Sequence, residues 1–458
     1  MANVNTSPTF AADVSNYIQK KTLELVQRQL VAYQFGERLR LPKNRGVIYT
    51  ASRYDRINLP IAPLSEGIPP VGESMSLVQV NATAQQWGDI VTVTDVADFT
   101  IDHPLFKKAI ELVAMQFSET LERNTFNTML SGTQINYVNT RGARASLLST
   151  DVLNPHEINR AFGALTTLGA PQYNGQLEED TKIEAGKPAK GSMDPKGQPH
   201  YVAITHPLVA QDLRENATIV TAWQQSDINK LYNNEVGTWG ALRFTTSNMV
   251  PYFIGVTAPT TSPSANNGSY AANTVGGSLA TGSYYVQIVG AVAQNGYEQR
   301  IGIASGAISV TGPSGSISVT TPNLGAGYTW NLYLDTVASP VHLGATSGGP
   351  NSGPLAGQAV QLASNTTCVL TSVGAARVPP AAPTAGVTVY PTFIFGKYAY
   401  GQVMLDDPEF SYLTGKDKSD PLGQLKVVGW KIMYGTILLN QNFFMRIESS
   451  SAFSATFG

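Results

Sequence analysis

An almost uncharged stretch in the second half of the chain constrains its organisation more than any other feature. Between residues 257 and 387 the charged residues are Glu298, Arg300, Asp335 and Arg377. Thr, Ser, Gly and Ala dominate this stretch. A break in composition this sharp indicates a separate module within the chain.

Short β-forming runs divide this module. Asn295 and Gly296 form a hairpin turn signal, and about seven short strands fit into roughly 130 residues. That size and pattern are typical of an immunoglobulin-like sandwich, and a flexible low-complexity segment is the alternative. We favour the sandwich because apolar residues alternate in two of the runs. These residues are Tyr284, Val286, Ile288, Trp330, Leu332 and Leu334.

Proline-rich seams flank the module, with APTTSPS before it and VPPAAPTAG after it. Both are typical of linkers between domains. After the second seam, TVYPTFIFGKYAYGQVMLD resumes a β-like, aromatic-rich pattern. We therefore predict that residues 256–388 form an inserted domain and that the host domain resumes over 389–458.

The totals exclude several classes of protein. The net charge is −2 and charged residues make up 14%, so the whole chain carries no electrostatic signature of nucleic-acid or membrane binding. The single Cys368 excludes a disulfide framework within one chain. The start of the chain lacks the pattern of a secretory signal, and no run is long enough to span a bilayer. We expect a soluble product made in the cytoplasm.

The first host segments combine a helix with a long irregular excursion. Helical spacing of apolar residues predicts a helix over 13–34, and β-formers begin at residue 46. Prolines and glycines then prevent a helix or a central strand up to about residue 90. Five apolar residues lie along this excursion, too many for a solvated linker, so we expect it to cover another surface. They are Ile57, Leu59, Ile61, Leu64 and Ile68.

A long amphipathic helix follows a strand that includes VTVT at 91–94. One apolar stripe along it consists of Phe106, Ile110, Val113, Phe117 and Leu121. The other faces carry Glu111, Glu119, Glu122 and Arg123. The predicted span, 104–131, would give a rod of about 40 Å at ~1.5 Å per residue. The alternative is the central core helix of an α/β domain.

Residues 151–255 predict a mixed α/β region. NPHEINRAFGALTTLG is typical of a helix with a glycine stop, and HYVAITHPLVAQDLREN of a buried strand, a turn at His206-Pro207 and a short helix. Between them lies a charged loop with no periodicity. It contains Glu178, Glu179, Asp180 and Glu184, but interspersed lysines favour a solvated loop over a metal site.

No motif predicts a catalytic group, a metal site or a cofactor. The five histidines lack metal-ligand spacing, and for His103 and His206 a capping or turn role is the better interpretation. Cys368 lies in a β-run and is interpreted as a small buried hydrophobe rather than a nucleophile. The basic residues of the first 45 positions are interspersed with Glu24 and Glu37, which favours a solvated helix face or a subunit contact over nucleic-acid binding.

The order of these parts resembles the major capsid proteins of tailed phages. WGDIVTVTDVADFTIDHPLFKKAIELVAMQFSETLERNTFNTMLSGT is similar to the loop-return strand and spine helix of the branch typified by N-four-like phages. YVAITHPLVAQDLR, NNEVGTWGALRFTTSNMV and DPLGQLKVVGWKIMYGTILLNQNFFMRIES are similar to later blocks of that branch. The resemblance spans residues 1–255 and 388–458, and the inserted domain departs from it.

The resemblance implies an α+β, HK-97-type capsid fold with an inserted all-β immunoglobulin-like sandwich. It implies the following division: an N-terminal arm (1–45), an extended β-hairpin loop (46–90), a peripheral domain (91–150) with a spine helix (104–131), an axial domain (151–255), the insert (256–388) and a return to the core (389–458).

The resemblance further implies a non-enzymatic shell subunit that assembles in the host cytoplasm with many copies of itself, as pentamers and hexamers. It leaves scaffold, portal and cement proteins open as further partners, with packaged DNA bound only non-specifically and no membrane contact. The candidates for intersubunit contact are Leu23, Leu30, Arg53, Arg56, Ile57, Leu59, Ile61, Leu64 and Ile68.

Two other functions stay open at this point. A surface protein that binds a receptor or glycan could use tyrosines at the loop tips of the module, namely Tyr270, Tyr297 and Tyr328. A polysaccharide hydrolase could use Glu178 or Asp194, although catalytic carboxylates belong on rigid elements rather than in a charged loop.

Overall fold

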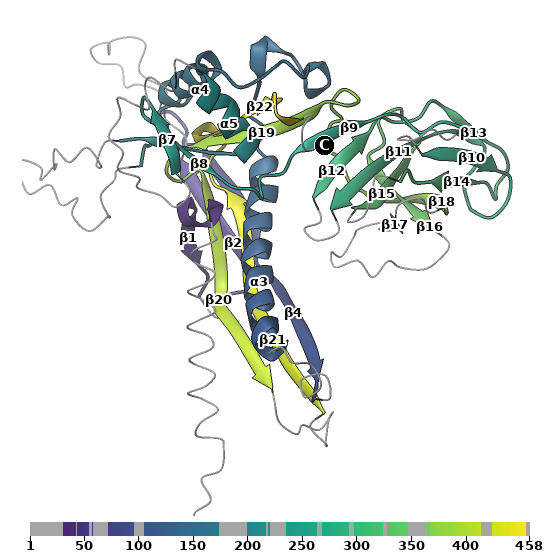
Figure 1. Cartoon of the computed structure of the whole chain (residues 1–458), viewed down its shortest axis with the longest axis horizontal. Coiled ribbons are helices and arrows are strands. Elements are labelled where there is room, and N and C mark those ends of the chain that lie inside the picture. The colour runs from purple at the N-terminus through teal and green to yellow at the C-terminus, as the bar shows by residue number, and fades with distance from the viewer. Residues whose placement is uncertain are drawn as a thin grey trace, which may run out of the picture. The chain divides into compact units, whose positions relative to one another are not determined.

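The computed structural model divides the chain into two compact units, each of which is described by itself (Figure 1). The first comprises Met1–Thr133, Leu168–Tyr173 and Phe395–Phe444, and the second comprises Gln134–Thr167, Asn174–Ile394 and Met445–Gly458. The residues described are 31–42, 44–54, 57, 72–95, 105–173, 199–216, 219, 235–262, 268–292, 297–323, 328–346, 362–363, 367–413 and 424–454. The class is α+β, as predicted.

A four-stranded sheet with one long helix forms the body of the first unit (Figure 1). The strand order is β1 (Glu37–Arg40), β20 (Tyr400–Leu413), β21 (Leu425–Leu438) and β4 (Gln85–Thr94). Helix α3 (Leu105–Leu130) packs on one face of this sheet. The predicted apolar stripe is confirmed, because Val113, Phe117 and Leu121 are buried against β21 and Phe106 and Ile110 pack beside them.

The alternating strand ahead of α3 is longer than the VTVT motif alone indicated. It begins at Gln85 and pairs with β21 along its whole length, from Gln85–Tyr434 to Thr94–Leu425. The aromatic residues Trp430 and Phe410 meet Phe117 edge-on at 5.1 and 5.3 Å between ring centroids. Sequence far downstream of the insert therefore completes the core that α3 covers.

The opposite face of the sheet carries a two-stranded hairpin. Strands β2 (Ile48–Tyr54) and β3 (Leu77–Thr83) pair antiparallel. A second apolar cluster joins this hairpin to the sheet. The predicted extended loop thus contains a regular hairpin at its two ends, and its central part, 58–71, lies outside the described residues.

One acidic residue of α3 has an environment that the helical pattern did not show. Glu122, expected on a face away from the apolar stripe, is buried, with 1% of its surface exposed. It contacts the short 3-10 helix η1 (Ala32–Phe35). The predicted helix over 13–34 lies outside the described residues except for its last four positions, which belong to the segment that contacts Glu122.

The host part of the second unit is a mixed sheet with two helices, α4 (Pro155–Thr167) and α5 (Pro207–Glu215) (Figure 1). Its strands run in the order β9, β19, β6, β8 and β7, and β22 pairs with β19 and β5. Their bounds are β5 (Ile135–Tyr137), β6 (Tyr201–Thr205), β7 (Glu235–Trp239), β8 (Leu242–Thr246), β9 (Phe253–Val256), β19 (Thr388–Phe395) and β22 (Phe444–Ser449). The predicted helix with a glycine stop is confirmed, because Gly169 follows α4 with φ 68°. Short 3-10 turns η2 (Val138–Thr140), η3 (Arg144–Ser146) and, in the first unit, η6 (Gln441–Phe443) complete the elements.

The uncharged stretch forms β strands around a core of its own. The described part contains nine strands rather than about seven: β10 (Ser269–Asn273), β11 (Gly282–Val292), β12 (Glu298–Gly302), β13 (Ile308–Val310), β14 (Ser316–Thr320), β15 (Tyr328–Asp335), β16 (His342–Thr346), β17 (Leu362–Ala363) and β18 (Thr367–Ala376). The ladder β10-β14-β18 and the ladder formed by β11 and β15 enclose one apolar cluster. All six residues of the predicted alternation lie in that cluster, and so does Cys368.

The insert is joined to the host by strand pairing rather than by linkers alone. Strand β12 pairs parallel with β9, and β9 pairs antiparallel with β19, so one sheet continues from insert to host within the second unit. The chain enters and leaves at adjacent positions, because Gly255 N donates to Val387 O and Gly386 N donates to Gly255 O, each at 3.0 Å. Two neighbouring ends of this kind are what an insertion requires.

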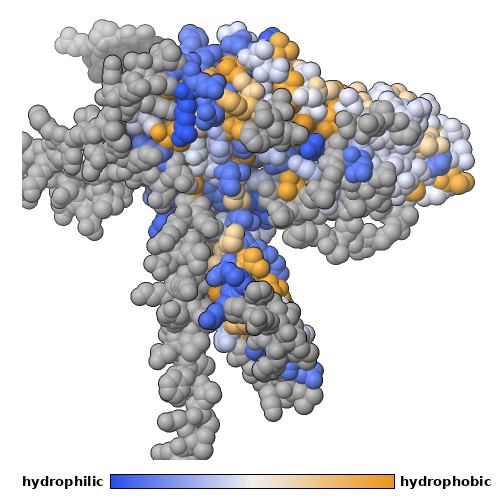
Figure 2. Space-filling view, in the orientation of Figure 1, coloured by the Kyte–Doolittle hydropathy of each residue, from blue (hydrophilic) through white to orange (hydrophobic). Residues whose placement is uncertain are grey.

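The four charged residues of the insert are neutralised or stacked inside it. Glu298 accepts from Arg377 at 3.0 Å and from Tyr333 at 2.7 Å, and the Arg300 guanidinium lies 4.5 Å from the centroid of the Tyr328 ring. Asp335 bonds to His342 Nδ1 at 2.7 Å. Figure 2 shows mostly pale colours of weak hydropathy over the insert, which reflect its many Thr, Ser, Gly and Ala residues.

Candidate intersubunit surface

The β2–β3 hairpin has one covered face and one exposed face. Tyr49, Val80 and Ala82 point to the covered face, where they pack with Val403 and Ile437 of the sheet. The opposite face consists of four cross-strand pairs: Ile48–Thr83, Thr50–Asn81, Ser52–Gln79 and Tyr54–Leu77. All eight of these residues are exposed. The residues of the other parity face the sheet, and Tyr49, Val80 and Ala82 among them hold the hairpin on it.

The exposed face is apolar at its two ends and polar in the middle. Tyr54 and Leu77 face each other across the strands with 69% and 46% of their surfaces exposed. Close to them in sequence, Ile57 and Met75 are 56% and 69% exposed. Burying apolar surface of this kind yields ~25 cal/mol per Å². Large exposed apolar side chains at one end of a hairpin are typical of a protein contact surface.

The structure describes only some of the residues predicted for this surface. Ile57 is exposed, whereas Arg53 lies on the covered side of the hairpin and is half-buried. Leu23, Leu30, Arg56, Leu59, Ile61, Leu64 and Ile68 lie outside the described residues, so their roles stay predictions.

Sequence reasoning missed Tyr54, Met75 and Leu77. A signal was present: Ile48 and Tyr54 have the same parity in a strand whose other parity, Tyr49 and Ala51, is also apolar. Large apolar residues of both parities in one strand are compatible with cover on both faces of that strand. The predicted contact residues were instead taken mainly from the proline-rich centre of the excursion.

His206 and Cys368 have structural roles. His206 caps α5, since its Nδ1 accepts from Leu208 N at 3.3 Å, and its ring stacks 4.8 Å from that of Tyr390. Burial lowers the pKa of His206 to about 4, which keeps the ring neutral at pH 7. Burial also raises the pKa of the Cys368 thiol. The predicted cap at His206 and the predicted buried hydrophobe at Cys368 are confirmed, and His103 lies outside the described residues.

Two neighbouring carboxylates, Asp406 and Asp407, line a recess of about 190 Å³ beside β1. This is below the ~300 Å³ at which small-molecule pockets begin. Asp407 is 2.8 Å from Arg40, and both side chains of that ion pair are largely exposed. The recess thus lacks the enclosed, apolar character of a glycosidase site. Glu178 and Asp194, the predicted alternatives for such a site, lie outside the described residues.

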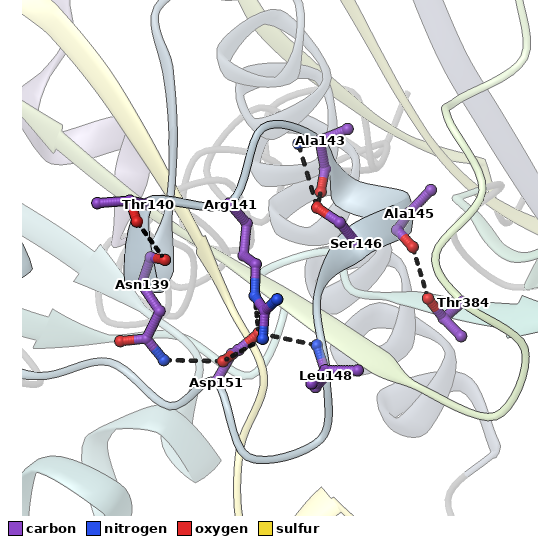
Figure 3. A network of polar contacts seen from close by, with 9 residues as sticks. All are labelled: Asn139, Thr140, Arg141, Ala143, Ala145, Ser146, Leu148, Asp151 and Thr384. Carbon is purple, nitrogen blue, oxygen red and sulfur yellow. Dashed lines mark hydrogen bonds and ion pairs between the residues drawn. The ribbon is translucent and has the colours of Figure 1, made fainter.

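A loop of the second unit, residues 139–151, is held by hydrogen bonds and contacts the chain where it returns from the insert (Figure 3). Asp151 accepts from Asn139 Nδ2, Arg141 Nε and Leu148 N at 2.8–2.9 Å. Burial alone would raise its pKa, but these hydrogen bonds and the Arg141 charge lower the pKa of Asp151 below its usual value. Thr384 Oγ1 donates to Ala145 O at 2.6 Å, which ties the returning chain to this loop.

A buried ion pair reinforces the same attachment. The guanidinium of Arg144 donates to both oxygens of Glu448 and, at 2.7 Å, to Ala381 O. It also lies 3.8 Å from the centroid of the Phe253 ring, on β9. Arg446 forms a second ion pair with Glu448 at 3.0 Å. The proline-rich seam after the insert is therefore held by side chains rather than free.

Within the described residues, no group of three or more His, Cys, Asp or Glu side chains could hold a metal ion. In that same part of the chain, no helix is long and apolar enough to cross a membrane.

Known structures similar to this chain include phage capsids and a phage head. The capsid of Ralstonia phage GP4 is 10% identical, with a TM-score of 0.49 over 93% of this chain and 92% of that one. The Cyanophage Pam1 capsid is 10% identical, with a TM-score of 0.47 over 90% and 89%. The head structure of Helicobacter pylori bacteriophage KHP40 is 8% identical, with a TM-score of 0.45 over 90% and 86%. No family model and no curated protein matches the sequence.

Proposed function

We propose that this chain is the major capsid protein of a tailed phage, a non-enzymatic subunit of HK-97-type fold that assembles into an icosahedral shell around phage DNA. The observation that carries the proposal is the exposed apolar end of the β2–β3 hairpin. Tyr54 and Leu77 are exposed to water, so their apolar surface contributes burial free energy only when another molecule covers it with a complementary surface. We infer that this molecule is a second copy of the chain.

The rest of the first unit supports the same function. Helix α3 is a straight rod of 26 residues, about 40 Å at ~1.5 Å per residue, backed by three long strands. Such a frame supplies span and stiffness rather than a reactive pocket. Repeated heterologous contacts between identical frames can close into rings of five and six. The virion shell is then the site of action, after assembly in the host cytoplasm.

In this proposal the insert is an immunoglobulin-like decoration that projects outward from the shell. Its support is the enclosed core, the adjacent entry and exit, and the near-neutral surface. Scaffold, portal and cement proteins remain candidate partners, and packaged DNA would be bound without sequence preference.

The alternative, a receptor- or glycan-binding structural protein, loses part of its basis. Tyr297 was predicted at a loop tip but is buried, with 3% exposed. Tyr270 packs against the core of the insert, and Tyr328 stacks on Arg300. Aromatic rings engaged in these contacts are less available to stack on a sugar.

The test compares two substitutions on one face of the hairpin. Tyr54→Asp with Leu77→Asp should reduce the yield of shells at least about tenfold, because two charges would be buried without partners in the contact. Thr50→Asp, on the same face but in its polar middle, is the matched control and should still assemble. The measurement is electron microscopy and sedimentation of the full chain, expressed alone and with its neighbouring gene products.

Melting curves separate assembly from folding in this experiment. Both variants should melt within a few degrees of the unaltered chain, since exposed positions change stability by less than about 0.5 kcal/mol. Shells formed normally by Tyr54→Asp with Leu77→Asp would show that the hairpin is not the contact. Discrete monomers from the unaltered chain in both preparations would overturn the shell proposal and favour the binding protein.

A further inference from the structure

Helix α3 carries a second stripe of side chains on the face opposite the sheet. Its members recur in alternate steps of four and three residues, which is the spacing of a coiled-coil seam. They are Lys108, Leu112, Met115, Glu119, Glu122, Phe126 and Met129. Large apolar residues on two faces of one helix are typical of a helix that is packed on both faces.

Within the described residues, only the second half of this stripe is covered. Glu122, Phe126 and Met129 are buried, with at most 1% of their surfaces exposed. In the first half, Leu112 and Met115 are 61% and 40% exposed. The change from a bare to a covered stripe falls one turn before Glu122.

The chain enters the first unit at this same point. Ala32 N donates to both carboxylate oxygens of Glu122, at 2.9 and 3.1 Å, and Tyr33 N donates to one of them at 3.3 Å. The N–H groups inside a helix bond to carbonyls of the preceding turn, so donation to Glu122 shows that η1 (Ala32–Phe35) begins here as a separate element. Residues 1–30 therefore join the unit beside the bare half of the stripe.

The segment that ends at this point has a matching stripe in its sequence. Leu23, Val26 and Leu30 recur in steps of three and four residues within the predicted helix. A helix over 13–30 would extend about 27 Å at ~1.5 Å per residue, whereas the bare half, 108–119, extends about 16 Å. Residues 13–30 lie outside the described residues, but their length is sufficient to cover the bare half.

The covered half of the stripe indicates the direction in which such a helix would run. A helix antiparallel to α3 that ends at Glu122 would lie over Phe126 and Met129, which are already buried. A helix parallel to α3 would lie over the bare half instead. We therefore expect the segment to run in the same direction as α3.

In the parallel direction the apolar steps of the two stripes coincide. When the segment ends one turn before the buried carboxylate, Leu23 falls beside Leu112. In the same register Val26 falls beside Met115. The two exposed apolar residues of α3 would then be buried by two apolar residues, which contributes burial free energy on both sides.

We propose that residues 13–30 form a helix that packs, parallel to α3, on the bare half of this stripe of the same chain. Helix α3 is then held between its sheet on one face and the N-terminal helix on the other. The sequence alone predicted Leu23 and Leu30 as contacts between copies. This proposal assigns both residues to a contact within one chain.

Disulfide formation in the purified, dilute, unassembled full chain tests the register. Val26→Cys with Met115→Cys should crosslink within one chain at least about tenfold more than Val26→Cys with Asn127→Cys, because a disulfide requires Cα atoms closer than ~7 Å. Asn127 is the matched control, since it is exposed on another face of α3. The native Cys368 is buried and is common to both variants.

The crosslinked products distinguish the other possible occupants of the stripe. Equal yields from the two cysteine pairs would show that the segment is not held on the stripe and would overturn the proposal. Crosslinks that join two chains, and that increase with protein concentration, would overturn it in favour of a second copy as the occupant. Electrophoresis and mass spectrometry of the linked peptides are the measurements.

Hydrogen exchange tests the same contact without added cysteines. Peptides from 16–30 should be protected in the unaltered chain, and Leu112→Asp with Met115→Asp should increase their exchange at least about tenfold, because the apolar contact is lost. Exchange in β21 should not change, which shows that the variant is folded, and Asn127→Asp should behave as the unaltered chain. Unprotected residues 16–30 in the unaltered chain, or protection that survives both Asp substitutions, would overturn the proposal. Both tests use unassembled chains, so their outcome is independent of whether shells form.

Discussion

The β2–β3 hairpin and the insert are both antiparallel β structures, yet they complete their cores in different ways. The insert encloses Trp330 and twelve other buried residues between two ladders of its own. The hairpin has only two strands and leaves Tyr54, Leu77 and Ile48 in water. Two-stranded hairpins are marginal by themselves, whereas three or more strands with a buried face are not. The comparison supports the proposal that the insert is complete within one copy and that the hairpin face is covered by another copy.

The charged residues of the insert and of its attachment are likewise satisfied within one chain. In the insert, Glu298 and Asp335 have their partners within the module. The polar groups that tie the insert to the host, Arg144, Glu448 and Asp151, are buried and satisfied within the second unit. We therefore expect substitutions in the insert to act on the folding of the insert and substitutions on the exposed hairpin face to act on assembly.

The largest expected effect on folding comes from the centre of the insert. Trp330 is fully buried, so Trp330→Ala should destabilise the insert by about 3–5 kcal/mol through lost burial and a cavity. Hydrogen exchange should show increased exchange throughout β11, β14 and β15 and little change in α3 or β21. The control is Val275→Ala, at a position 69% exposed, which should have no measurable effect. Equal loss of protection in both units would contradict the independence of the insert core.

Substitution at the contacts that attach the insert to the host should lower the free energy of unfolding almost as much. Arg144→Met leaves the fully buried Glu448 with Arg446 alone and removes the donor to Ala381 O, at an expected cost of about 3 kcal/mol. Urea unfolding of the full chain should detect this loss. Arg144→Lys should recover part of it, because a positive charge then stays beside Glu448, whereas Glu448→Gln would remove the ion-pair partner of the buried Arg446. An Arg144→Lys variant no more stable than Arg144→Met would show that the contact to Ala381, not the charge, dominates.

The sequence predicted elements whose cores are local and missed contacts between distant segments. The alternation in β11 and β15 and the stripe on α3 were readable because 2.0 and 3.6 residue periods place those side chains on one face. The burial of Glu122 was not readable, since its partners, Ala32 and Tyr33, lie about 90 positions upstream. Likewise, Arg144 and Glu448 are 304 positions apart, and no periodicity connects them.

For the candidate surface, the sequence indicated the segment that contains the hairpin, and the structure adds exposed residues that the sequence did not indicate. The excess of apolar residues over 57–68 predicted a covered surface; Ile57 is exposed in the single chain, and its role stays a prediction. The hairpin face itself escaped because parity in a strand says which residues share a face, not which face the rest of the chain covers. The sequence alone does not say whether Tyr49 or Tyr54 packs on the sheet. The cluster that Tyr49 forms with Val403 and Ile437 shows that it is Tyr49.

A smaller effect is expected at the loop that holds the returning chain. Asp151→Asn should destabilise the second unit by about 1.5–3 kcal/mol, because a carboxylate that accepts three hydrogen bonds is replaced by an amide. The pKa of Asp151 is lowered in the folded chain, so its contribution is present above its usual value of 3.8 and is lost as the pH falls through the folded value. Thermal unfolding between pH 7 and pH 3 should show the difference between variant and unaltered chain shrinking in acid. A constant difference would mean that the side-chain shape, not its charge, holds the loop.

Removal of the whole insert should have the smallest effect on the host fold and on shell assembly. If the insert is complete in itself, deleting residues 258–385 should leave the host fold and shell assembly intact, because Gly255 and Val387 are already joined by a backbone hydrogen bond of 3.0 Å. The deletion does expose the edge of β9 that β12 covered, so the join should keep Arg144 and Phe253, which stabilise β9 from the host side. Electron microscopy of the deleted chain beside the unaltered one is the measurement, with the pair Tyr54→Asp and Leu77→Asp as the assembly-negative control. Soluble, folded subunits that no longer form shells would show that the insert takes part in the lattice and that the division between a self-sufficient insert and a partner-dependent hairpin is wrong.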